Sequence, residues 1–218
     1  MAKKQKKGPY NPLDKINLGR SVANALLSSS LKSLPPPSFR GAGIYAIYYF
    51  GRNPLYSYIS DFNNRKDLDG EWTIYIGKAG GAGSRKGMID LGEKGTALSK
   101  RISKHASSIE LGDGLASSDF KCRYLTIDSI WIPLGEQLLI QKFKPLWNTI
   151  DGFGNNDPGM GRKNQRTSPW DLLHPGRNYA NKDTGNKLIS SLEEFKKEVV
   201  AIQRETYNEL ISSEVDKL

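Results

Sequence analysis

The prediction of the fold starts from the stretch Gly43-Ile44-Tyr45-Ala46-Ile47-Tyr48-Tyr49-Phe50. Its β-branched and aromatic residues are typical of a strand. Because side chains alternate across a strand, Tyr45, Ile47 and Tyr49 are expected on one face and Ile44, Ala46 and Tyr48 on the other. The sequence therefore predicts a strand over residues 43–50 that carries Tyr45.

A second apolar run, Trp72–Lys78, predicts another strand, in which Tyr75 and Gly77 share a face. A long connection, Gly51–Glu71, separates the two strands. The second strand leads into Gly80-Gly81-Ala82-Gly83, which could cradle a phosphate but has neither the Gly-x-x-x-x-Gly-Lys-Ser/Thr nor the Gly-x-Gly-x-x-Gly spacing. We interpret this stretch as a flexible bend.

A helix and a third strand are predicted next. Thr96–Glu110 has apolar residues at helical spacing, with Thr96 available as an N-cap. Arg101 and His105 are one turn apart in this helix and therefore project together. Lys121–Ile127 is predicted to be a strand.

A further helix is expected from Pro133 to about Phe143, because proline suits a first helical turn and Pro145 ends the pattern. Glu136 lies near the start of this helix, and Asn148 follows its end. The carboxylate of Glu136 could simply offset the helix dipole, and Asn148 could cap a turn. The order of Glu136 and Asn148 after the earlier polar residues also permits a functional role.

The flanking segments differ in character. Residues 1–10 form a basic arm, and a helix is expected over Ile16–Leu31, ended by the prolines at 35–37. Asp151–Asn186 is rich in Gly, Asn and Pro and could be a surface loop or wrap DNA through its basic residues. The basic residues of this loop are Arg162, Lys163, Arg166 and Arg177.

Ser191–Val215 is the clearest predicted helix, because Ser191 and Glu194 have capping-box spacing before an apolar stripe. The stripe favours packing against the core over a dimer contact. Domain boundaries are accordingly expected near residues 40 and 150: an arm and helix over 1–40, a core over 41–150, and a loop and helix over 151–218.

Composition restricts the partners. The 218 residues include 32 Lys and Arg against 23 Asp and Glu, which gives a formal charge of +9. This charge favours a polyanion such as a nucleic acid as the partner. The alternative is a protein that is merely basic. No apolar run is long enough to span a membrane, and no apolar stretch follows the basic start, so we expect a cytoplasmic protein. Cys122 with His105 and His174 gives too few ligands for a Cys/His zinc site.

The order Tyr45, Tyr75, Lys78, Arg101, His105, Glu136 and Asn148, on strand, strand, helix and helix, resembles the GIY-YIG nuclease superfamily. The resemblance spans about Gly41–Ile150. It implies an α+β fold: a small core with a central antiparallel three-stranded sheet flanked by helices, here with N- and C-terminal extensions.

The resemblance also implies phosphodiester hydrolysis in double-stranded DNA with one divalent metal, Mg²⁺ or Mn²⁺. Tyr45 is the candidate general base, and His105 competes with it for that role. Cations are needed to favour a tyrosine phenolate at neutral pH, and Lys78 and Arg101 could supply them. Glu136 is the candidate metal ligand. Tyr75 and Asn148 would orient the reacting groups.

Within the superfamily, Arg101-x-x-x-His105, the long connection and the two flanking segments are most similar to type II restriction endonucleases, particularly those that cut CCGCGG. A homodimer on DNA is then expected, because a palindrome presents two equal half-sites. Repair-type and homing nucleases of the superfamily are alternatives, but they normally carry further DNA-binding regions. A basic DNA-binding module without catalysis is another. A PD-(D/E)xK nuclease is a further alternative, but its motif would rest only on Glu194-x-Lys196, which lies in the predicted C-terminal helix, and we discount it.

Overall fold

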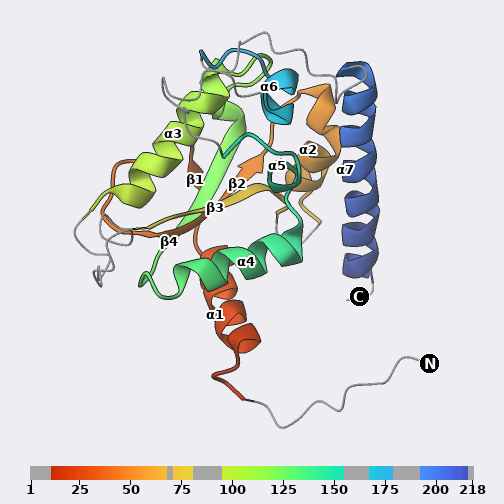
Figure 1. Cartoon of the computed structure of the whole chain (residues 1–218). Helices are drawn as coiled ribbons and strands as arrows, with labels where there is room; N and C mark the ends of the chain where they lie inside the picture. Colours follow the sequence, from red (N-terminus) through yellow and green to blue (C-terminus); the bar gives the residue numbers. More distant parts are fainter. Residues whose placement is uncertain (1–10, 68–70, 81–94, 155–166, 179–191, 216–218) are drawn as a thin grey trace.

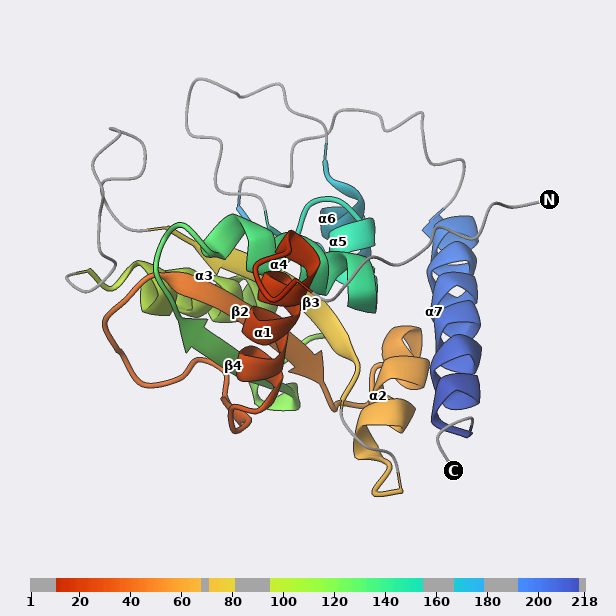
Figure 2. The ribbon, with the colours of Figure 1, turned by 90° about the horizontal axis from the view of Figure 1, so that it is seen from below.

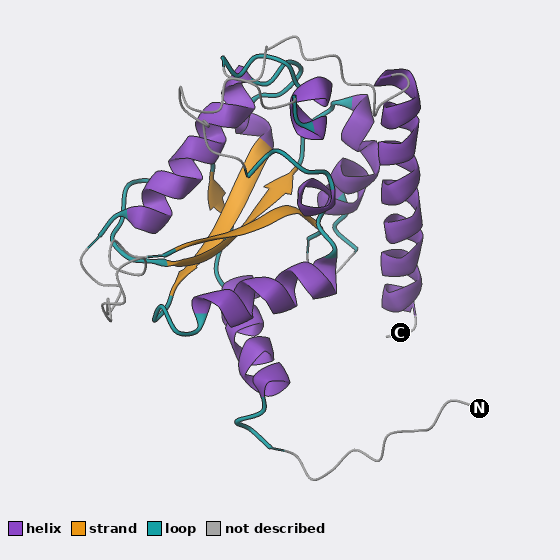
Figure 3. Cartoon of the chain, viewed as in Figure 1, coloured by secondary structure: helices purple, strands orange, loops and turns teal. Residues whose placement is uncertain are grey.

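The computed structural model describes residues 11–67, 71–80, 95–154, 167–178 and 192–215. One antiparallel sheet lies at its centre, with the strand order β1-β4-β2-β3. Figure 3 shows this sheet surrounded by helices. The strands are β1 (Lys32–Ser33), β2 (Gly43–Tyr49), β3 (Thr73–Ala79) and β4 (Phe120–Thr126).

The central strand β2 has a separate hydrophobic core on each face, as its alternating pattern predicts. Tyr45, Ile47 and Tyr49 belong to the larger core. Ile44, Ala46 and Tyr48 belong to the smaller one. Every residue of β2 is buried, because the strand is paired on both sides and covered on both faces.

Helices cover the two faces unequally. Helices α1 (Lys15–Leu27) and α4 (Ile132–Phe143) pack over the smaller core (Figures 1 and 2). Helix α3 (Ala97–Leu111) contributes Ile102 and Ile109 to the larger core. The remaining described helices are η1 (Pro54–Tyr56), α2 (Ser57–Asn64), η3 (Ser117–Asp119), α5 (Leu146–Thr149), α6 (Pro169–Leu173) and α7 (Leu192–Val215).

The α+β fold and the three principal strands are as predicted, and three local expectations are wrong. The sheet has a fourth strand, β1, which pairs with β4. Its two residues are too few to show the alternation of side chains by which a strand is predicted from sequence. Helix α1 ends at Leu27 rather than Leu31, because Ser29 bonds the Leu26 carbonyl and closes the helix. The Thr96 side chain does not cap α3; the Leu98 amide instead donates to the Gly41 carbonyl.

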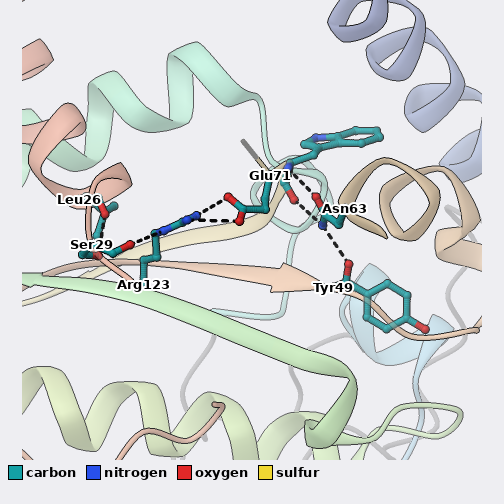
Figure 4. A network of polar contacts seen from close by, with 7 residues as sticks. Leu26, Ser29, Tyr49, Asn63, Glu71 and Arg123 are labelled. Carbon is teal, nitrogen blue, oxygen red and sulfur yellow. Dashed lines mark hydrogen bonds and ion pairs between the residues drawn. The ribbon is translucent and has the colours of Figure 1, made fainter. Parts of the chain in front are cut away.

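The connection between β2 and β3 is folded rather than irregular. It forms η1 and α2, and its return is fixed by two polar networks (Figure 4). The Asn63 amide donates to the Tyr49 and Trp72 carbonyls, at 2.9 and 3.0 Å, and accepts from the Trp72 amide at 2.6 Å. Arg123 of β4 pairs with Glu71 at 2.5 Å. These contacts hold the beginning of β3 against the end of β2.

Helix α7 lies alongside α2, and Figures 1 and 2 both show it at one side of the molecule. Val199 is fully buried, and Gln203 donates to the Leu55 carbonyl at 2.7 Å. The apolar stripe therefore packs against the chain's own core, the alternative that the sequence favours. The expected capping residue Ser191 lies outside the described residues. None of the described helices has the length and apolarity that crossing a membrane requires.

Candidate active site

Tyr45 and Tyr75 come from neighbouring strands and face the same side of the sheet. In the β2–β3 ladder, Tyr45 pairs with Gly77 and Ile47 pairs with Tyr75. The two tyrosine rings lie in the larger core with their centroids 6.1 Å apart. The antiparallel register therefore brings together two tripeptides, Gly43-Ile44-Tyr45 and Tyr75-Ile76-Gly77.

The Tyr45 hydroxyl occupies the space that a side chain at position 77 would need, so glycine fits there. A Cβ atom on Gly77 would collide with Tyr45 Oη and approach the Tyr75 ring. Gly43 lies against β4, where a Cβ would collide with the Leu125 carbonyl oxygen. Close packing thus explains the glycine in each tripeptide.

His105 completes a buried pair with Tyr45. The Tyr45 Oη and His105 Nε2 atoms lie 2.6 Å apart, and the two side chains are 0% and 2% exposed. Burial, and then the negative charge that Tyr75 would carry, raise the pKa of Tyr45 well above its ordinary value. Burial, and then the charge of Arg101, lower the pKa of His105 well below its ordinary value. At neutral pH the pair is therefore a protonated tyrosine and a neutral imidazole.

Arg101 lies one turn before His105 on α3 and brings positive charge to the site. Its charge and its hydrogen bonding oppose the burial that raises the pKa of Tyr45 and of Tyr75. Its Nη2 donates to the Gly154 carbonyl at 2.5 Å. A guanidinium in this place stabilises negative charge on either tyrosine oxygen or on a phosphate.

Phe153 and Gly154, which the sequence interpretation did not include, form one wall of the site. The Phe153 ring stacks on His105, with centroids 4.6 Å apart and an interplanar angle of 24°. It also meets Tyr75 edge to face at 4.8 Å. A Cβ on Gly154 would lie 2.6 Å from Tyr75 Oη, so only glycine fits there without a shift. The one signal in the sequence is an aromatic residue between two glycines at 152–154.

Asn148 lies on α5 and binds the backbone of β3. Its Oδ1 accepts from the Ile76 amide and its Nδ2 donates to the Ile76 carbonyl, both at 2.8 Å. Because Ile76 separates Tyr75 from Gly77, this amide fixes the strand at the position where both residues face Tyr45. Asn148 therefore acts on the site through the β3 backbone.

Lys78 and Glu136 form an ion pair on the other side of β3. Alternation places Lys78 on the face opposite Gly77, toward α4, and its Nζ lies 2.6 Å from Glu136 Oε2. The Glu136 side chain is 18% exposed. Because β3 is the last strand in the sheet order, no further strand separates this ion pair from the face that carries Tyr75. The charge of Glu136 accordingly raises the pKa of Tyr75.

The described residues contain no group of three or more His, Cys, Asp or Glu that could hold a metal ion. Among these residues Glu136 belongs to no such group, and it is bonded to Lys78. A hard oxygen donor of this kind fits a divalent cation that keeps several waters and takes further ligands from substrate phosphates. It does not form an all-protein cage.

Arg177 does not have the exposed position predicted for a DNA contact. It is 1% exposed, and its Nε donates to Asp171 at 2.6 Å, because the chain after α6 turns inward and places the guanidinium in the core. Arg162, Lys163 and Arg166, predicted to contact DNA, lie outside the described residues, as do residues 1–10 and 81–83. The other predicted site residues surround the β2–β3 pair.

A sheet that pairs these two tyrosines, with an arginine and a histidine from one helix and a glutamate from another, defines a GIY-YIG nuclease. The chain belongs to this class: the family described as "Eco29kI GIY-YIG domain" matches residues 37–203, more than half of the chain. Eco29kI is a type II restriction endonuclease that cuts CCGCGG. The matched region includes α6 and part of α7, beyond the Ile150 limit of the resemblance seen in sequence. None of the curated proteins matches the chain.

Proposed function

We propose that this protein is a type II restriction endonuclease that hydrolyses double-stranded DNA at a specific sequence. Membership of a family of DNA endonucleases supports the reaction class. The observation that carries the proposal is the 2.6 Å contact between Tyr45 and His105 beside Arg101, since it joins a proton acceptor to a phosphate-binding cation. This contact argues against a DNA-binding module without catalysis, and the match to the Eco29kI family favours a restriction endonuclease over a repair or homing nuclease.

The proposed proton path uses both members of the pair. An attacking water transfers a proton to Tyr45 Oη as the Tyr45 proton passes to His105 Nε2, so the tyrosine is never an isolated phenolate. The lowered pKa of His105 leaves its imidazole neutral and able to accept at neutral pH. The hydroxide forms a bond to phosphorus, the bond to the leaving oxygen breaks, and that oxygen takes a proton from solvent.

The remaining residues position and neutralise the phosphate. Arg101 would bind nonbridging oxygens, and Tyr75, which is 8% exposed, would hydrogen-bond the phosphate or the water. Since Tyr45 is fully buried, we propose that DNA and water approach it from the side of Tyr75 and Arg101. Lys78 would contribute positive charge from across β3.

GIY-YIG nucleases are generally metal-dependent. Glu136 would hold the ion, for which we propose Mg²⁺ or Mn²⁺, after leaving its ion pair with Lys78. Bound there, a divalent cation would stabilise negative charge on the leaving oxygen.

We further propose that the DNA-bound form is a homodimer, because two strands of a palindrome require two catalytic centres. Exposed apolar residues on the N-terminal side, Leu13 at 74% and Ile16 at 53%, are candidates for the contact between copies. Arg162, Lys163 and Arg166 remain the proposed DNA contacts, and the cytoplasm the proposed location.

The test is cleavage of two plasmids that differ only in one CCGCGG site, with and without Mg²⁺. We expect linear product only from the plasmid with the site and only with the metal. Glu136→Gln should abolish cleavage while binding is retained, because it removes a metal ligand and no phosphate-binding cation. Binding without cleavage by the unaltered protein, under every metal condition, would favour the non-catalytic alternative. Cleavage of both plasmids would contradict this recognition site.

A further inference from the structure

The turn Gly152–Gly154 contacts three residues of the candidate site. Its Phe153 ring touches His105 and Tyr75, and its Gly154 carbonyl accepts a hydrogen bond from Arg101. The orientations of Arg101 and His105 therefore depend on where this turn lies.

Arg177 binds the backbone of this turn. Its Nη2 donates to the Gly152 carbonyl at 3.0 Å and its Nη1 to the Phe153 carbonyl at 3.4 Å. Its Nε donates to Asp171 Oδ1 at 2.6 Å. One guanidinium thus joins two successive carbonyls of the turn to a carboxylate of α6.

The Asp171 end of this connection is fixed as well. Its second oxygen accepts from the Ser168 hydroxyl at 2.6 Å, and Ser168 is the N-cap of α6. The Trp170 amide donates to the Asp151 carbonyl at 3.1 Å, and the Trp170 ring lies 4.5 Å from the Arg177 guanidinium. Asp171, at 5% exposed, is as inaccessible to solvent as its partner.

A buried ion pair is weak evidence for stability, because desolvation opposes the attraction and apolar residues of similar volume often serve equally well. An arginine differs from an apolar residue, and from a lysine, in the fixed fork of donors that sets the geometry of its acceptors. Here the acceptors are the carbonyls of the turn that orients Arg101 and His105. The particular contribution of Arg177 is therefore geometric.

We propose that the buried pair Arg177–Asp171 positions Arg101 and His105 for phosphodiester cleavage by fixing the Gly152–Gly154 turn. The inference rests on the proposed nuclease function. Arg177 and Asp171 are positioning residues, because they act on Arg101 and His105 through the carbonyls of the turn and through α6.

The test compares Arg177→Lys with Tyr56→Phe. Lysine retains the charge beside Asp171 but lacks the planar fork of donors that holds Asp171 and the two carbonyls in one fixed geometry. Tyr56→Phe removes a buried hydroxyl, bonded to His174, from the same core without touching the turn, and serves as the matched control for loss of stability. We expect Arg177→Lys to lower kcat by about 10- to 100-fold with KM for DNA within about threefold, since misplacement near 1 Å has effects of this size. Tyr56→Phe should leave kcat within about threefold.

A second readout does not require activity. The chain has two histidines, so a histidine-labelled sample gives separate ring signals for His105 and His174 in a nuclear magnetic resonance spectrum. Moving Phe153 changes the ring current at His105, so Arg177→Lys should shift the His105 signals more than those of His174, which is linked to Arg177 through the Trp170 ring. Tyr56→Phe should do the reverse.

Unchanged kcat together with unshifted His105 signals in Arg177→Lys would overturn the inference. Shifted His105 signals in a protein whose unaltered form cuts no DNA would contradict the nuclease function but not the effect of the pair on the turn. If Arg177→Lys does not fold, Asp171→Asn carries the test, because it keeps the size of the side chain while it removes the charge that holds Arg177 and turns one of the two acceptor oxygens into a donor. A fall in kcat and a shift of His105 are again expected.

Discussion

Two buried tyrosine–histidine pairs lie in this molecule, and we propose a catalytic role for only one of them. In each pair a tyrosine hydroxyl approaches a histidine Nε2, at 2.6 Å for Tyr45–His105 and 2.5 Å for Tyr56–His174. The Tyr56 pair is closed: Trp147 donates to its hydroxyl at 3.0 Å, and His174 Nδ1 faces the Asp113 carbonyl at 2.9 Å. Because a carbonyl only accepts, Nδ1 carries the proton and Nε2 must accept from Tyr56.

The charged neighbours of the two histidines act in opposite directions. Burial lowers the pKa of His174 to about 4, and the acidic Asp113 and Asp171 oppose that shift. Burial also lowers the pKa of His105, but there the cations Arg101, Arg177 and Lys104 add to it. We infer from this difference that the surroundings of a buried tyrosine–histidine pair determine whether it can take a catalytic role. Cations that can bind phosphate distinguish the Tyr45 pair.

The largest expected effect separates the two histidines. His105→Ala should lower the single-turnover cleavage rate by about 10²- to 10⁴-fold, because it removes the proton acceptor. His174→Ala should leave that rate within about threefold and lower the free energy of unfolding by about 1–3 kcal/mol, because Tyr56 and the Asp113 carbonyl lose a buried partner. Cleavage kinetics and urea unfolding of both variants check this. Equal rates in the two variants would remove the distinction between the pairs.

A smaller effect is expected from the two asparagines that bind the chain at the middle of β3 and just before its start. Asn148→Ala frees the backbone of Ile76 beside the site, whereas Asn63→Ala frees Trp72 at the distant end. Both changes should destabilise the strand, but only Asn148→Ala should lower kcat, by about tenfold, through misplacement of Tyr75. Steady-state kinetics decides the matter, and a similar fall of kcat in Asn63→Ala would mean that the loss reflects general loosening of the sheet.

The pH dependence of the free energy of unfolding tests the burial of His174 in its pair with Tyr56. Above pH 6.5, the ordinary pKa of histidine, His174 is neutral both folded and unfolded. Between that pH and about 4, the unfolded chain binds a proton that the folded protein does not, so the free energy of unfolding should fall as pH falls through this window, by up to about 3 kcal/mol. His105 contributes in the same direction. Urea unfolding from pH 7 to pH 4 measures the loss, which His174→Gln should reduce; a flat profile would contradict the burial of both histidines.

The smallest expected effect concerns the basic residues outside the site. Replacing Arg162, Lys163 or Arg166 by alanine should reduce the log–log salt slope of DNA binding by about 0.9 for each phosphate that the variant no longer neutralises. The cleavage rate at saturating protein should not change. Fluorescence anisotropy at several salt concentrations measures the slope, and a slope unaltered by all three changes would exclude these residues as phosphate-binding groups.

Much of the site could be predicted because its residues lie in regular elements. Tyr45 and Tyr75 follow from strand alternation, and Arg101 and His105 from helical spacing. Their contacts required the register of β2 against β3, which places Gly77 opposite Tyr45 and which a long connection leaves undetermined in sequence.

The segment after α5 could not be predicted in the same way. Phe153 and Arg177 lie in stretches without apolar periodicity, so no pattern indicates that one stacks on His105 and the other is buried with Asp171. A charged residue in such a stretch is normally exposed, and the prediction that Arg177 contacts DNA followed that rule. Only the tertiary fold supplies the carboxylate and carbonyls that make its burial possible.

The most direct test is a comparison of Tyr45→Phe and Tyr56→Phe in single-turnover cleavage of a CCGCGG plasmid with Mg²⁺. Each variant removes one hydroxyl from one tyrosine–histidine pair, and each should still fold, as circular dichroism would check. We predict that Tyr45→Phe loses at least about 100-fold in rate at unchanged DNA affinity, because no oxygen remains to take the water proton, while Tyr56→Phe stays within about threefold. Full-rate cleavage by folded Tyr45→Phe would contradict the central claim.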